Sequence, residues 1–133
     1  MKAPKRQDLI YPELSYKIIG TCFDIFNELG FGHKEKYYQK ALEVEFGNKA
    51  IRYQSQVKSD LFFKENKVGL YYFDFLIDDK IIVELKTGSR FKKRDYEQVK
   101  SYLVQSKLKL GILVRFDESG VTFSRVLLPY LNS

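Results

Sequence analysis

The apolar residues in the first third of the chain recur at the spacing of a helix. Between positions 13 and 29 they fall every three or four residues, and Gly30 follows. This pattern predicts an amphipathic helix over 13–29 whose apolar stripe includes Cys22, which is therefore expected in the core. A second helix is predicted over 34–46, because apolar residues repeat there at every fourth position and Gly47 follows.

The rest of the chain alternates short apolar runs with polar turns, which is typical of strands around one further helix. Strands are predicted over 51–63, 71–77, 81–85, 109–116 and 120–128, and a helix over 91–105. The strand, helix and strand from 81 onwards should form a right-handed crossover that joins parallel neighbours. The prediction is a single α/β domain over 13–133, a mixed sheet flanked by helices, after a loose basic tail over 1–12.

The two central strands form a hairpin whose turn length decides its chemistry. Residues 78–80 are Asp, Asp and Lys, which are typical of a turn. Asp78 and Asp79 are therefore better explained as turn residues than as a pair of metal ligands. A two-residue loop would place Asp74 opposite Val83 and would direct Glu84 to the other side of the sheet. A three-residue loop places Asp74 opposite Glu84 instead, with their Cβ atoms roughly 4.5–5.5 Å apart.

Polarity favours the three-residue loop. It gathers the apolar side chains of the hairpin on one face, namely Phe73, Phe75, Ile77, Ile81, Val83 and Leu85. On the other face Lys86 joins Asp74 and Glu84. Opposed carboxylates repel each other, so they need a cation, a shared proton or a lysine. Mg²⁺ fits because it takes one or two carboxylates and also binds phosphate oxygens, although solvated strand carboxylates beside a salt-bridging lysine remain an alternative.

Composition and charge extend this interpretation. The chain has 133 residues, 44% of them hydrophobic, which is enough for one domain with a core. Its formal net charge of +6 favours polyanionic partners. A basic cluster lies at the predicted start of the third helix, where free backbone N–H groups also attract phosphate; it consists of Arg90, Lys92, Lys93 and Arg94. The alternative is a solvated basic turn.

Other features bear on location. Cys22 is the only cysteine, so an internal disulfide is excluded. The first residues lack an apolar signal core, and no segment approaches the roughly 18 apolar residues of a membrane span. We therefore expect a cytoplasmic protein without a membrane partner.

Several short motifs, in order, resemble one family. The segment GHKEKYY at 32–38 fits a G-x-x-E-x-x-Y signature, IVELK at 82–86 resembles a Glu-x-Lys strand, and QVKSY at 98–102 resembles the Q-x-x-x-Y element of recombination-linked exonucleases. Together with the opening helix and the strand at 108–114, they resemble the GxxExxY family of the PD-(D/E)XK nuclease superfamily over about residues 13–117. This resemblance implies a restriction-endonuclease-like α-β-β-β-α-β core.

The resemblance also implies roles for particular residues. It makes Asp74 and Glu84 metal ligands and Lys86 the residue that positions or activates water. Glu35 could hold a second metal or orient water, although a carboxylate also suits the first turn of a helix. The resemblance turns Gln98 and Tyr102 toward the site, whereas the simpler interpretation is a hydrogen-bonded Gln and a core Tyr.

Aromatic residues and the single histidine are assigned more simply. Tyr38 is expected to pack and to fix Glu35, and His33 to be exposed rather than to bind a metal. Three other tyrosines could stack on bases of a single-stranded substrate, although core or sheet positions are the simpler interpretation; they are Tyr37, Tyr71 and Tyr72.

The sequence thus predicts a Mg²⁺- or Mn²⁺-dependent nuclease that hydrolyses phosphodiester bonds, with DNA favoured over RNA. One departure from the superfamily pattern is Phe73, which stands where a proline gives the superfamily its name. The alternatives are an inactive nucleic-acid-binding module and a protein-interaction subunit on a nuclease fold. A homodimer would enlarge the small binding surface, but the sequence does not decide it.

Overall fold

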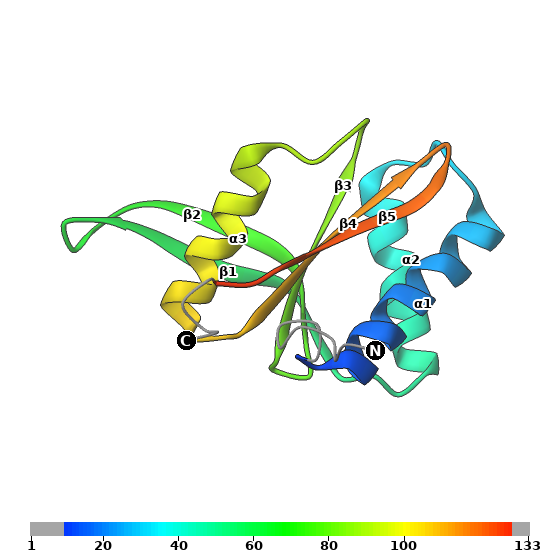
Figure 1. Cartoon of the computed structure of the whole chain (residues 1–133), viewed down its shortest axis with the longest axis horizontal. Coiled ribbons are helices and arrows are strands. Elements are labelled where there is room, and N and C mark those ends of the chain that lie inside the picture. The colour runs from blue at the N-terminus through cyan, green and yellow to red at the C-terminus, as the bar shows by residue number, and fades with distance from the viewer. Residues whose placement is uncertain (1–9, 129–133) are drawn as a thin grey trace, which may run out of the picture.

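Residues 10–128 of the protein are described by a computed structural model (Figure 1). In chain order the elements are α1 (Pro12–Leu29), α2 (Glu35–Asn48), β1 (Tyr53–Phe63), β2 (Asn66–Ile77), β3 (Ile81–Thr87), α3 (Lys93–Ser106), β4 (Leu110–Asp117) and β5 (Gly120–Val126). All eight correspond to predicted elements. Most of the tail predicted over 1–12 lies outside the described residues, and α1 already begins at its last residue.

The strands form one five-stranded sheet in the order β1-β2-β3-β4-β5. Only β3 and β4 run parallel, and α3 connects them, whereas the other neighbours are antiparallel. The predicted mixed sheet and its parallel crossover pair are therefore confirmed. None of the helices in the described range is long and apolar enough to cross a membrane.

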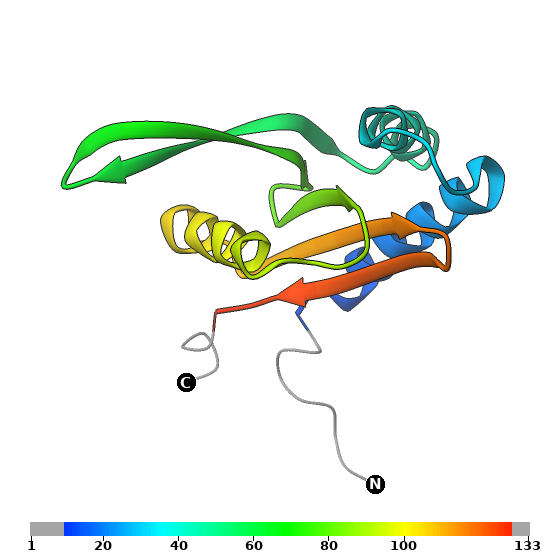
Figure 2. The ribbon, with the colours of Figure 1, turned by 90° about the horizontal axis from the view of Figure 1, so that it is seen from above.

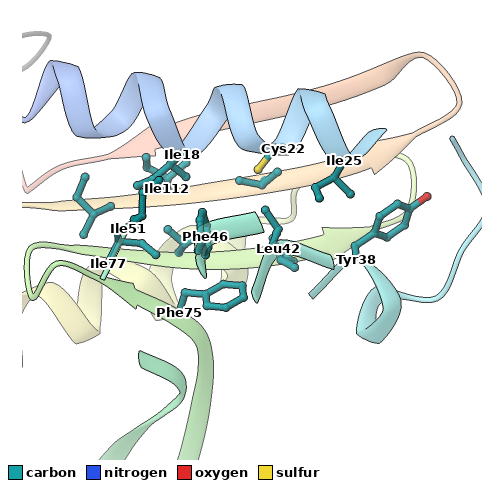
Figure 3. Packing of buried hydrophobic residues seen from close by; sticks show 14 of the residues in the cluster. Ile18, Cys22, Ile25, Tyr38, Leu42, Phe46, Ile51, Phe75, Ile77 and Ile112 are labelled. Carbon is teal, nitrogen blue, oxygen red and sulfur yellow. The ribbon is translucent and has the colours of Figure 1, made fainter. Parts of the chain in front are cut away.

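The sheet is covered on both faces because its central strands are apolar on both sides. Ile81, Val83 and Leu85 of β3 join the large cluster beneath α1 and α2, where Cys22 is fully buried as predicted (Figure 3). Ile82 faces the other way and packs with Val99 of α3. Polar residues of β3 that follow Ile82 in alternation therefore lie on the α3 face.

Tyr38 anchors α2 to the loop that precedes it. Its side chain is buried, stacks on Phe116 with ring centroids 4.2 Å apart, and donates a hydrogen bond to the Gly30 carbonyl at 2.6 Å. The predicted packing role is therefore confirmed. The predicted end of the helix at Gly47 is wrong, because Gly47 keeps helical geometry and α2 continues to Asn48.

The central hairpin has the three-residue loop. Ile77 pairs with Ile81, which confirms the preferred register, and the Lys80 N–H closes the turn on the Ile77 carbonyl. Asp78 and Asp79 adopt left-handed φ angles of 51° and 56°. Such angles suit aspartate in turns, so these carboxylates serve the turn, as predicted.

The predicted apolar face of the hairpin is wrong at Phe73. Its ring packs with the α3 cluster, 5.0 Å from the ring centroid of Tyr102, rather than beside Phe75. The alternation breaks because the β2–β3 pairing ends at Phe75, and Gln56 of β1 lies level with Asp74 in a left-handed conformation, with φ of 53°. Beyond this point the β1–β2 hairpin passes over α3 and extends past it (Figure 2).

Candidate active site

The two predicted metal ligands lie where β2 and β3 separate. The Asp74 N–H donates to the Glu84 carboxylate at 3.0 Å, and the Leu85 N–H donates to the Asp74 carboxylate at 2.7 Å. The regular backbone pairing of β2 and β3 ends at Phe75 and Val83. Beyond that point each carboxylate accepts a hydrogen bond from a backbone N–H group of the opposite strand. This exchange fixes Asp74 and Glu84 against each other.

The environment of this pair favours a bound proton or cation. Burial raises the pKa of Glu84 to about 9, and the charge of Asp74 adds to the rise. Burial also raises the pKa of Asp74, and the two side chains hydrogen bond to each other. Two neighbouring, partly buried carboxylates repel each other when both are ionised, so either a proton or a cation bound between them would be favourable.

Lys86 supplies the nearest positive charge. Its Nζ lies 3.8 Å from the Glu84 carboxylate and 3.4 Å from the carboxylate of Asp95, and 28% of its side chain is exposed. The ammonium group therefore stays accessible to a substrate while two acids hold it in place.

Asp95 is a site residue that the sequence analysis missed. It lies in the first turn of α3 with only 8% of its side chain exposed. One carboxylate oxygen accepts the Lys92 N–H at 2.8 Å, and the other faces Lys86. An acid three residues after a helix N-cap is a recognisable capping signal. Asp95 directly follows the basic cluster in the sequence, so its capping role could have been predicted. The capping pattern does not, however, predict a contact with Lys86.

Glu35 approaches from the other helical layer. It begins α2, and the first turns of α2 and α3 lie on either side of the end of β3 (Figure 1). Burial raises the pKa of Glu35 and the charge of Asp74 raises it further, while Lys86 and a backbone hydrogen bond from Thr87 oppose the rise. Glu35 is therefore close enough to interact electrostatically with Asp74 and Lys86.

The three carboxylates predicted as metal ligands, Asp74, Glu84 and Glu35, are not all close enough to bind one metal ion directly. Within residues 10–128, no three His, Cys, Asp or Glu side chains are grouped closely enough to hold a metal ion together. Asp74 and Glu84 nevertheless suit Mg²⁺, which needs only one or two protein carboxylates and retains several waters. A cation bound by both would offset the negative charge of the two carboxylates in place of a proton. Glu35 would then act on a water rather than as a third direct ligand.

Gln98 and Tyr102 have different surroundings despite sharing a helix face. Gln98 lines a polar cavity that also includes Lys86. Tyr102 packs against Phe73, and burial raises the pKa of its phenol. The structure thus brings Gln98 to the site and places Tyr102 in the neighbouring apolar cluster. His33 is exposed as predicted, and its Nε2 lies 2.8 Å from the Leu29 carbonyl oxygen.

Most of the basic cluster lies around the same cavity. The cavity measures about 280 Å³ and is lined by Lys86, Thr87, Arg90, Lys92, Arg94, Asp95 and Gln98. Lys93 is exposed on the first turn of α3 but is not part of the lining. Cations therefore adjoin the carboxylate pair on its α3 side, as a site for a phosphate backbone requires.

Comparison with known families agrees with this geometry. A family model described as "PD-(D/E)XK nuclease superfamily" matches residues 12–126. The chain belongs to the PD-(D/E)XK nuclease superfamily. Members are generally nucleases that act on nucleic acid and typically use divalent metals.

A solved structure shows the same fold. The one described as "Crystal structure of SSO0001" matches with a TM-score of 0.52 and 20% identity, covering 93% of this chain and 60% of that one. This chain therefore spans about three fifths of the length of that protein. At this identity the likeness shows the restriction-endonuclease-like fold alone. No curated protein matches the chain.

Proposed function

We propose that the protein is a Mg²⁺- or Mn²⁺-dependent nuclease that hydrolyses phosphodiester bonds in DNA. The observation that carries this proposal is the carboxylate pair, in which Asp74 and Glu84 each accept a backbone N–H group from the other's strand. Burial and the charge of Asp74 raise the pKa of Glu84, and a cation bound between the two carboxylates would relieve this repulsion. Lys86 and the basic cavity beside it offer positive charges that can bind the phosphate groups of a nucleic acid.

Each side chain has a role that follows from its position. A cation held by Asp74 and Glu84 would supply Lewis acidity toward the phosphate and lower the pKa of a bound water. Lys86 places positive charge where the pentavalent transition state gains negative charge. Glu35, with its raised pKa, can accept a hydrogen bond from the attacking water and orient it. Gln98 can donate an amide hydrogen bond to a phosphate oxygen.

The arginines and lysines around the cavity would bind the substrate through its backbone. Arg90, Lys92 and Arg94 line the cavity beside Lys86, and Lys93 lies on the adjoining first turn of α3. Backbone contacts position a nucleic acid without reading its sequence. We therefore expect recognition of DNA structure rather than cutting at specific bases.

A cleavage assay tests the proposal. Labelled single-stranded, duplex and branched DNA, and RNA, are incubated with Mg²⁺ or Mn²⁺ and either wild type, Glu84→Ala or Lys86→Ala. Both variants should lose at least about 100-fold in rate, because Glu84→Ala removes a ligand of the proposed cation and Lys86→Ala removes positive charge that would stabilise the transition state. Matched controls are Glu97→Ala and Lys109→Ala, which change exposed residues outside the site.

The alternatives give different results in the same experiment. An inactive binding module would bind nucleic acid in a salt-sensitive manner without cleaving any substrate. A protein-interaction subunit would show neither cleavage nor salt-sensitive binding. Equal cleavage by wild type and Glu84→Ala would contradict the proposed site.

The family within the superfamily, the cellular location and the oligomeric state stay predictions. The G-x-x-E-x-x-Y signature at 32–38 supports membership of the GxxExxY family within the superfamily. The single buried cysteine suits the cytoplasm. A homodimer would add binding surface to so small a domain, and sedimentation of the purified protein would test it.

A further inference from the structure

A second hollow lies between α2 and β1. It measures about 430 Å³ and is lined by Lys36, Tyr37, Gln39, Lys40, Glu43 and Gln56. None of these residues belongs to the site described above. A volume of this size lies within the range of roughly 300–1,000 Å³ that is usual for small-ligand sites.

Two lining residues of the hollow are neighbours of residues in the candidate active site. Lys36 directly follows Glu35 in the first turn of α2. On the other wall Gln56 lies level with Asp74, between the pairs that β1 forms with β2 on either side. The wall of the hollow that carries Gln56 is therefore beside the strand position of Asp74.

The lining residues combine an aromatic face, cations and amides. Tyr37 is 50% exposed, and the Nζ of Lys36 lies 5.5 Å from the centroid of its ring. Lys36 and Lys40 outnumber the one acid, Glu43. An accessible aromatic ring flanked by lysines is the combination that binds single-stranded nucleic acid, since bases stack on the ring and phosphates pair with the cations.

This chemistry favours a single strand over a duplex. The bases of a duplex stack on each other and offer no free face to Tyr37, whereas an unpaired base does. The amides of Gln39 and Gln56 can hydrogen bond to such a base without demanding one sequence, because an amide both donates and accepts.

We propose that the hollow binds a nucleotide of single-stranded DNA next to the cleavage point. Its base stacks on Tyr37, and its phosphates contact Lys36 and Lys40. This inference rests on the proposed function, because it extends the same substrate track to the α2 side. It assigns the nuclease a preference for substrates with an unpaired strand.

Equilibrium binding tests the proposal without cleavage. Fluorescence anisotropy of a labelled single-stranded DNA oligonucleotide is measured in the absence of divalent cations. Tyr37→Ala should weaken binding about 5- to 100-fold through lost stacking, whereas Tyr37→Phe should bind like wild type. The matched control is Tyr16→Ala, which removes a ring that is 81% exposed on α1.

Salt dependence tests the two lysines separately. The double variant Lys36→Ala/Lys40→Ala should reduce the slope of log K against log salt by about 1.4, which is about 0.7 for each phosphate contact on a single strand. The control double variant is Lys17→Ala/Lys109→Ala, whose lysines are exposed outside the hollow. An unchanged slope in the first double variant would overturn the phosphate contacts.

Further arms separate this inference from the proposed function. Equal losses on single-stranded and duplex DNA, or no loss in Tyr37→Ala, would overturn the stacking site. Loss of the same size on single-stranded RNA would support the hollow and extend it to both nucleic acids. If wild type cleaves nothing but Tyr37→Ala still loses single-strand binding, the hollow stands while the nuclease proposal fails. If cleavage depends on Glu84 but Tyr37→Ala binds normally, only the hollow fails.

Discussion

Asp74 and Glu84 are held by opposing influences. The N–H groups of Asp74 and Leu85 stabilise the ionised carboxylates, but burial outweighs them and raises the pKa of both acids, and the charge of Asp74 raises that of Glu84 further. Nearby Lys86 lowers both pKa values, but burial is the largest influence on each. The two carboxylates are thus placed where an additional positive charge, such as a bound cation, would stabilise their ionised forms.

The first prediction concerns pH and stability. Because the folded pKa of Glu84 is about 9 and its ordinary value is 4.5, its proton stabilises the folded state at low pH. That contribution is fully present below about pH 4.5 and is lost as pH rises toward 9. Without divalent cations, the free energy of unfolding of wild type should therefore fall between pH 5 and pH 9 by up to about 1.4 kcal/mol per pH unit relative to Glu84→Gln.

Urea denaturation of both proteins across this range measures the difference. Parallel pH dependences in wild type and Glu84→Gln would show that the acid titrates normally. Asp60→Asn is the control, because its carboxylate lies on the β1–β2 hairpin and pairs with Lys67 instead.

The second prediction concerns Asp95. Asp95→Asn keeps an oxygen that can accept the Lys92 N–H, but it removes the negative charge that faces Lys86. The lysine should then be held less well, lowering kcat about tenfold with little change in KM, since small displacements of a catalytic group are costly. Steady-state kinetics measure both constants. A changed KM with an unchanged kcat would assign Asp95 to substrate binding instead.

At the scale of elements, α3 is positioned by close packing on β4. A Cβ added at Gly111 would collide with a methyl group of Val99 and lie 3.0 Å from one of Ile82. The absent side chain lets the helix approach the sheet, and the same helix carries Asp95 and Gln98. The packing of α3 therefore sets the geometry of the site.

The third prediction follows from this contact. Gly111→Ala should destabilise the fold by about 1–3 kcal/mol through overpacking and should reduce cleavage by displacing α3. Gly20→Ala is the matched control, since nothing lies within 4 Å of an added Cβ there and the residue is inside α1. It should stabilise the fold by up to about 1 kcal/mol. Urea denaturation and the cleavage assay, run on both variants, check the two effects. Normal activity in a destabilised Gly111→Ala protein would contradict the link between packing and site.

Sequence patterns located the elements well but not their local irregularities. The alternation of apolar and polar residues in the hairpin predicted the Ile77–Ile81 register, because only the three-residue loop gathers the apolar side chains on one face. It failed at Phe73, since the break beside Gln56 depends on how β1 and β2 bend over α3. Such bending is a property of the packed sheet and leaves no mark on a period-two pattern.

For the whole molecule, the formal net charge is +6. Lysines and arginines line the α3 cavity beside Lys86, and two lysines line the α2 hollow. This arrangement attracts a polyanion to a site that would otherwise repel it.

The fourth prediction concerns metal and global stability. Mg²⁺ or Mn²⁺ should raise the midpoint of thermal unfolding, because a ligand that binds only the folded state stabilises it, by about 2.7 kcal/mol at 100 times Kd. The double variant Asp74→Asn/Glu84→Gln should show no such rise. Differential scanning fluorimetry measures it, with Asp60→Asn/Glu97→Gln as the control. An equal rise in both double variants would place the metal elsewhere.

The sequence by itself determined the α/β class, the hairpin register that opposes Asp74 and Glu84, and the position of the basic cluster at a helix start. These follow from period, turn chemistry and spacing, which are local along the chain. Only the tertiary structure decided that Asp95 contacts Lys86, that Tyr102 packs on Phe73, and that a hollow forms between α2 and Gln56 of β1. Those contacts join separate elements, and their geometry depends on how the helices pack on a twisted sheet.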